Sequence, residues 1–110
     1  MKVNQGDIVE VYFELPNGKL KSHPALVISN QNVLDTGDIF YAVMISTKLY
    51  NDEFSFELKD EMLTKPMKLQ SFVKCQLIQS YKLNEVFLKI SVLKHSYFEE
   101  VKNKIFETVF

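Results

Sequence analysis

Two uninterrupted apolar runs, residues 25–28 and 39–45, constrain most strongly what this chain can fold into. Both are short and bounded by polar or turn-forming residues, which is the pattern of strands buried on both faces. Pro24 opens the first run and disfavours helical geometry in the residue before it, so His23 should lie at the mouth of the strand. The second run ends at Ser46-Thr47.

The segment before the first run predicts a hairpin. Residues 8–13 (IVEVYF) combine alternation with β-forming side chains. Pro16-Asn17-Gly18 follows as a turn signal, because proline fixes φ and Asn-Gly tolerates positive φ. Residues 8–13 and roughly 19–29 are therefore predicted to be two strands joined by a loop.

The sequence contains no arginine, so lysine is the side chain with a full positive charge at neutral pH that this chain can offer to phosphate. If residues 19–23 are extended, Lys19, Lys21 and His23 share one face, since side chains alternate along a strand. This row is the best local candidate for a phosphate contact. The net charge is -1, but between residues 65 and 104 eight lysines face three glutamates, which makes a basic face available. Lysine binds phosphate as a point charge, without the bidentate fork of arginine.

Three further strands are predicted downstream, at residues 54–58, 71–80 and 86–93, from alternation or apolar content. The stretch between the two apolar runs, 30–38 (NQNVLDTGD), is dense in turn formers and predicts a polar loop.

The C-terminal end of the chain changes to a helical period. Ser96-Tyr97-Phe98-Glu99 has the form of a capping box, and apolar residues recur from Phe98 to Val109 at helical spacing. The prediction is one helix over 97–108, packed on the sheet. Five or more strands followed by a helix predict one mainly β domain over residues 1–110, a small, strongly curved antiparallel barrel with a C-terminal α-helix.

Several classes of protein are disfavoured. Cys75 is the only cysteine, so an internal disulfide and a cysteine metal cluster are excluded. His23 and His95 have no acidic or thiol partner at ligand spacing, so we expect no metal and no cofactor. The N-terminus lacks the apolar core of a secretory signal, and the longest apolar run is too short to cross a bilayer. We therefore expect a cytoplasmic protein without a membrane partner.

Three segments together carry a resemblance to a known family. GDIVEVYF (6–13), SHPALVIS (22–29) and VMIST (43–47) resemble the MazF/PemK family of toxin endoribonucleases. The resemblance implies the SH3-like barrel of MazF, PemK and CcdB-type proteins. It also implies the activity of a metal-independent endoribonuclease, an mRNA interferase that cuts single-stranded RNA. It also implies a homodimer, and a small antitoxin protein that blocks the RNA groove.

The resemblance also implies where the chemistry lies. The family has an arginine before the proline, and this chain has His23 there. The family's threonine at the end of the third strand corresponds to Ser46 or Thr47. A second family arginine falls on Gln79, whereas a shift of one residue retains Gln76 as the family's glutamine. We thus expect His23, Ser46 and Thr47 as catalytic candidates. The candidates for RNA contacts are Lys19, Lys21, Gln76 and Gln79.

Two other interpretations stay open at this point. A catalytically degenerate family member could bind RNA or a protein partner without cutting, which the missing arginines favour. A CcdB-type gyrase poison would use the same barrel, but that type relies on a tryptophan near its C-terminus and this chain has no tryptophan. These three functions share one fold, so only the residues of the site can distinguish them.

Overall fold

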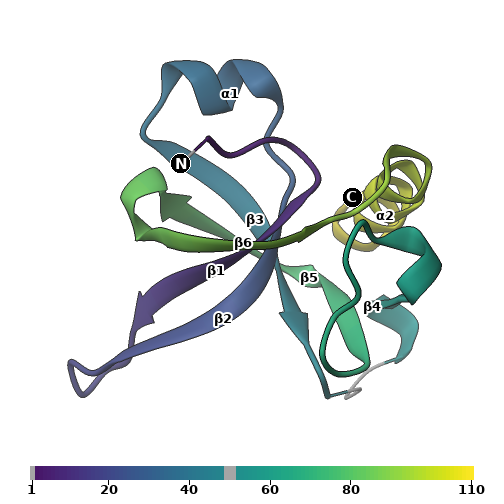
Figure 1. Cartoon of the computed structure of the whole chain (residues 1–110), viewed down its shortest axis with the longest axis horizontal. Helices are drawn as coiled ribbons and strands as arrows, with labels where there is room; N and C mark the ends of the chain where they lie inside the picture. Colours follow the sequence, from purple (N-terminus) through teal and green to yellow (C-terminus); the bar gives the residue numbers. More distant parts are fainter. Residues whose placement is uncertain (1, 49–51) are drawn as a thin grey trace.

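The computed structural model describes residues 2–48 and 52–110 and shows a six-stranded antiparallel sheet with a C-terminal helix (Figure 1). The strands are β1 (Asp7–Glu14), β2 (Leu20–Val27), β3 (Ile39–Ser46), β4 (Ser55–Leu58), β5 (Ser71–Lys82) and β6 (Val86–Val92). The helices are α1 (Gln31–Thr36) and α2 (His95–Val109), with short 3-10 turns η1 (Asp52–Phe54), η2 (Asp60–Met62) and η3 (Leu83–Glu85). The spatial order is β4-β5-β3-β2-β1-β6, so every predicted strand and the terminal helix are confirmed.

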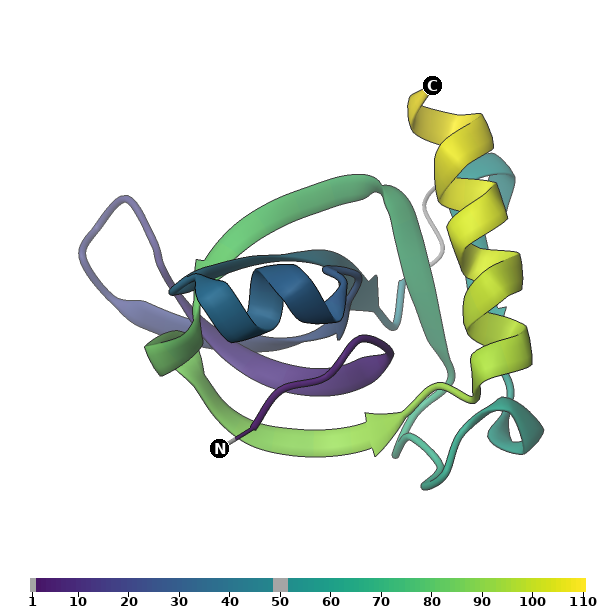
Figure 2. The same cartoon turned by 90° about the horizontal axis from the view of Figure 1, so that it is seen from above.

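The sheet curls into a half-barrel, and α1 lies across one open end of the curl (Figure 2). Helix α2 runs along the outside of the curl, beside β5. The curl is expected, since β5 carries an irregularity in its pairing with β3 and bulges bend strands. Figure 2 shows β5 bending sharply between its two halves.

Both faces of the central strands are buried, as the apolar runs predicted. One face forms the Phe40 cluster, whose members are Val3, Val9, Val11, Ala25, Val27, Leu34, Phe40, Ala42 and Tyr81. The other face forms the α2 cluster, which joins strand residues such as Leu26, Val43 and Val73 to Phe98, Val101 and Ile105 of α2. Successive residues of β2 and β3 alternate between the clusters, because side chains along a strand point to opposite faces.

The predicted loop at residues 30–38 is wrong in part, because Gln31–Thr36 forms helix α1. Asn30 caps this helix, its side-chain oxygen accepting from the Val33 amide at 3.1 Å. Leu34 is buried in the Phe40 cluster and anchors the helix to the sheet. The residues that favour turns also favour helix caps, so composition alone predicted a loop where a short capped helix forms.

The predicted capping box at Ser96 is also wrong. Helix α2 begins at His95 with Lys94 as its N-cap, so Ser96 lies inside the first turn. The start is fixed by tertiary contacts: the Lys94 amide donates to the Met62 carbonyl at 2.8 Å, and Lys94 Nζ donates to the Glu61 carbonyl at 2.9 Å. These contacts to η2 outweigh the local capping preference.

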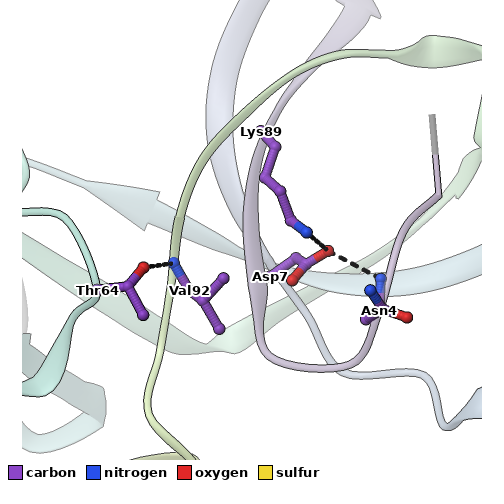
Figure 3. A network of polar contacts seen from close by, with 5 residues as sticks. All are labelled: Asn4, Asp7, Thr64, Lys89 and Val92. Atoms are coloured by element: carbon purple, nitrogen blue, oxygen red, sulfur yellow. Dashed lines mark hydrogen bonds and ion pairs between the residues drawn. The ribbon is translucent and has the colours of Figure 1, made fainter.

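A buried carboxylate ties the N-terminal segment to β1 and β6 (Figure 3). Asp7 is 2 % exposed, and its Oδ2 accepts from Lys89 Nζ at 3.0 Å and from the Asn4 amide at 2.8 Å. Nearby, Thr64 Oγ1 accepts from the Val92 amide at 3.1 Å and fastens the 63–70 segment to β6. A buried carboxylate is costly unless paired, so this network fixes where the sheet edge closes.

Replacing Lys89 by methionine should lower the free energy of unfolding by about 1–3 kcal/mol, because Asp7 keeps its burial and loses its cation. Urea unfolding measures the loss. The matched control is Lys102→Met, whose ion pair with Glu99 is exposed on α2 and should contribute about 0.5 kcal/mol or less. Equal losses for the two variants would contradict a structural role for the Asp7–Lys89 pair.

Candidate active site

A cleft of about 570 Å³ lies where β2 enters the sheet and β3 leaves it. The last residue pair between these strands joins Ala25 to Met44. The polar residues beyond that pair on each strand border the cleft. Four predicted site residues line it: Lys21, His23, Ser46 and Thr47. The adjacency of β2 and β3 therefore brings the pre-proline position and the hydroxyl pair together.

The imidazole of His23 is half-buried, and both ring nitrogens have polar neighbours. Nδ1 lies 3.0 Å from the carbonyl oxygen of Pro24. A carbonyl only accepts hydrogen bonds, so Nδ1 must carry a hydrogen in this contact. Nε2 lies 3.2 Å from the Tyr81 hydroxyl. Nε2 is therefore the ring atom that can give or take a proton.

Tyr81 lies in β5 and is nearly fully buried. Burial raises the pKa of the Tyr81 phenol above its ordinary value, and the nearby Glu85 carboxylate raises it further. Tyr81 thus remains a neutral hydroxyl through the physiological range. Its ring contacts that of Phe40 with centroids 6.0 Å apart, which anchors it in the Phe40 cluster.

The two candidate hydroxyls differ in their surroundings. Ser46 Oγ accepts from the Lys48 amide at 3.1 Å, so this serine helps to turn the chain at the end of β3. Thr47 is exposed and borders a second cleft as well as the first. Thr47 is therefore the hydroxyl placed to reach a ligand in either cleft.

The other predicted RNA-binding residues lie elsewhere. Lys19 belongs to the hairpin turn, where its amide donates to Asn17 Oδ1 at 3.0 Å, and it does not line the cleft. Gln76 is exposed in the irregular part of β5, between the residues that pair with Ile45 and Val43. Gln79 is connected to the site indirectly, because its Oε1 accepts from the Tyr81 hydroxyl at 2.8 Å.

A second cleft of about 450 Å³ adjoins the first and shares Pro24 and Thr47 with it. Its apolar lining comes from the 63–70 segment and β6, for example Met67 and Leu88. The charged residues around it are Lys65, Lys68, Lys89 and Glu10. Part of the basic stretch noted in the sequence therefore gathers beside the candidate site.

Sequence reasoning missed Lys48 and Ser71 at the site, and it missed the contact between Tyr81 and His23. Lys48 directly follows the predicted hydroxyl pair, so its position was a usable signal. Ser71 is buried and donates to the Leu69 carbonyl at 2.8 Å, and no sequence pattern predicts this contact. Tyr81 is 58 residues away from His23 in the chain.

Three further features of residues 2–48 and 52–110 concern metal-binding groups, the cysteine thiol and membrane-spanning helices. These residues contain no group of three or more His, Cys, Asp or Glu side chains placed to hold a metal ion. Cys75 is fully buried, and burial raises the pKa of its thiol to about 11, so the reactive thiolate is suppressed. Across the same described residues, neither helix combines the length and apolar character needed to span a bilayer.

The fold is that of MazF toxins. The chain superposes on a MazE–MazF complex from Deinococcus radiodurans with a TM-score of 0.81 at 15% identity, covering 99% of this chain and 96% of that one. A mycobacterial endoribonuclease in complex with its cognate antitoxin gives a TM-score of 0.77 at 13% identity, covering 97% and 94%. The Mycobacterium tuberculosis toxin MazF-mt6 gives 0.70 at 16% identity, covering 90% and 93%. No curated protein sequence matches the chain.

The sequence family is defined by an independent match. Residues 4–109 match the family described as PemK-like, MazF-like toxin of type II toxin-antitoxin system. Because this match spans nearly the whole chain, the protein belongs to the PemK/MazF-like toxin family. The predicted family and the predicted mainly β fold with a C-terminal helix are both confirmed.

Proposed function

We propose that this toxin-family protein is an endoribonuclease that cleaves single-stranded RNA without a metal ion, with His23 transferring the proton. The observation that carries the proposal is the meeting of His23, Lys21 and the Ser46-Thr47 pair around one cleft. The family match and the endoribonuclease among the structural neighbours support the class of reaction.

Cleavage within RNA places three demands on the site. The ribose 2′-OH must lose a proton as it attacks the adjacent phosphorus, the leaving 5′-oxygen must gain one, and the phosphate needs positive charge. Nε2 of His23 is suited to take the proton of the 2′-OH, and water can supply the proton that the leaving 5′-oxygen gains. Lys21 and Lys48 border the same cleft and supply charge. The hydroxyl of Ser46 or Thr47, which line the same cleft, is proposed to contact the phosphate.

The second cleft extends this surface for the flanking nucleotides. Lys65 and Lys68 can meet phosphates there, while the apolar floor suits a base. Gln79 supports Tyr81 through its Oε1, and its contact with RNA stays a prediction. The contributions of Lys19 and Gln76 stay predictions, and they would require RNA beyond the two clefts.

The direct test is incubation of the purified protein with single-stranded RNA of mixed sequence in buffer containing EDTA. The expected products are a 2′,3′-cyclic phosphate and a 5′-hydroxyl, the outcome of attack by the 2′-oxygen. RNA that stays intact would contradict the enzymatic function and favour the degenerate alternative, in which the protein binds without cleaving. The absence of arginine from the whole chain is the observation that favours this alternative.

Replacing Lys21 by alanine should reduce the salt dependence of RNA binding. Each neutralised phosphate of a single strand contributes about 0.7 to the slope of log K against log salt, so the slope should flatten by less than one unit. Binding titrations across a range of salt concentrations measure it. Lys59→Ala is the control, since Lys59 borders an acidic cleft with Glu57, Asp60 and Glu61. An unchanged slope for Lys21→Ala would remove this residue from the site.

The assembly we propose is a homodimer regulated by a small antitoxin protein. Exposed aromatic pairs support it: Tyr12 stacks on Phe87 with centroids 4.3 Å apart, and Phe106 lies 5.2 Å from Phe110. Apolar surface of this kind is typical of sites where proteins associate. Light scattering at micromolar concentration should give twice the 12.8 kDa chain mass, and the mass of one chain would exclude the dimer.

A further inference from the structure

The ring of His23 is held by a hydrogen-bond chain that crosses the sheet. His23 lies in β2, whereas Tyr81 and Gln79 lie in β5, and β3 separates these two strands. The contacts run from Nε2 of His23 to the Tyr81 hydroxyl at 3.2 Å and from that hydroxyl to Gln79 Oε1 at 2.8 Å. The curl of the sheet brings the two strands within reach of one long side chain.

The packing around Tyr81 explains how it spans β3. Ala25 of β2 and Ala42 of β3 are fully buried members of the same cluster. Their methyl groups are the smallest side chains of that cluster. Phe40 supports the ring from β3, with the centroids 6.0 Å apart. The phenol oxygen is thereby delivered to His23 by a packed scaffold rather than by a mobile surface residue.

The hydrogens in this chain can be counted. Nδ1 of His23 carries a hydrogen because it faces the Pro24 carbonyl, and the Tyr81 phenol has a single hydrogen to donate. If that hydrogen goes to Gln79 Oε1, Nε2 must donate to the phenol oxygen, and the ring is an imidazolium. If it goes to Nε2, the ring is neutral, and Gln79 satisfies the phenol oxygen with its NH2 group after a half-turn of the amide.

We infer that Tyr81 is a positioning residue for His23, and that Gln79 lets this pair hold the ring in either protonation state. A substrate hydroxyl that donates to Nε2 takes the place of the phenol hydrogen, which then turns to Gln79 Oε1. Once Nε2 carries the transferred proton it can donate to the phenol oxygen, so Tyr81 holds the ring before and after the proton transfer. Tyr81 fixes the ring from β5, outside the residues that line the cleft, and does not touch RNA. The inference rests on the proposed function, because positioning affects cleavage only if His23 transfers the proton.

A spectroscopic test is independent of cleavage. The full chain labelled with 15N and carrying His95→Gln has His23 as its single histidine. The neutral ring should show a protonated Nδ1 and an unprotonated Nε2 that accepts a hydrogen bond. Tyr81→Phe removes one oxygen and should move the Nε2 resonance to that of a nitrogen without a donor. Tyr97→Phe removes a hydroxyl from α2 and should leave the spectrum unchanged. An unchanged spectrum for Tyr81→Phe overturns the inference.

Kinetics then separate positioning from mere stability. Tyr81→Phe should lower kcat roughly 10–100-fold, the range found for partners that orient metal-bound imidazoles, and leave KM nearly unchanged. In a His23→Ala background it should have no further effect, since residues acting as a unit are not additive. Wild-type kcat in Tyr81→Phe overturns the positioning role. If wild type itself does not cleave, the proposed function fails, and the spectrum alone decides whether Tyr81 holds His23.

Discussion

Replacing His23 by alanine should abolish RNA cleavage in EDTA-containing buffer, a loss of about 10²–10⁴-fold if the residue acts as a general acid or base. The reason is that Nε2 is the ring nitrogen able to exchange a proton, because Nδ1 donates its hydrogen to the Pro24 carbonyl. The measurement is the initial rate on a fixed single-stranded RNA. His95→Ala is the matched control, because the other histidine is exposed at the start of α2.

Replacing His23 by arginine should preserve or raise the rate. The phosphate needs positive charge, and charge stabilisation is usually the larger contribution to catalysis. The surroundings suit a guanidinium, since the Pro24 carbonyl accepts hydrogen bonds and the Tyr81 hydroxyl can donate to Gln79 while accepting from the new side chain. If wild type is inactive, gain of cleavage by His23→Arg identifies a degenerate site. Strong cleavage that is indifferent to His23→Ala would place the active site elsewhere.

The strands could be predicted from the sequence because each one carries its own signal. The runs 25–28 and 39–45 are apolar throughout, since β2 and β3 lie centrally and are covered on both faces. Helix α1 could not be predicted in the same way. Its six residues gain stability from the Asn30 cap and from burial of Leu34, and neither contact leaves a helical period in so short a segment.

The part of the site that is built from the neighbouring strands β2 and β3 could be predicted from the sequence. Antiparallel adjacency of β2 and β3 is enough to bring His23 near the hydroxyl pair, and resemblance pointed to both positions. The link from His23 to Tyr81 depends on the curl of the sheet and on the irregular pairing between β3 and β5. Such a register is decided by packing across the whole barrel, so no local pattern contains it.

Replacing Phe40 by alanine should destabilise the protein by about 3–5 kcal/mol, because the cavity left in the core adds to the lost burial. Among the residues that the structure describes, Phe40 has the largest fully buried side chain. Typical domains have about 5–15 kcal/mol of total stability, so this variant approaches the limit of folding. Urea unfolding measures the loss. The control Phe106→Ala removes an exposed ring from α2 and should change stability by about 0.5 kcal/mol or less.

The effect of Phe40 should extend to the site, because its ring supports Tyr81 and Tyr81 contacts His23. Phe40→Leu tests this link, since it keeps most of the buried volume and should cost less than the ~3–5 kcal/mol expected for Phe40→Ala. Under conditions where this variant is fully folded, its rate of RNA cleavage should still fall below that of wild type. A Phe40→Leu variant that cleaves like wild type would show that the Tyr81 ring is held by the remaining cluster without Phe40. A Phe40→Ala variant as stable as Phe106→Ala would contradict the assignment of Phe40 to the buried core.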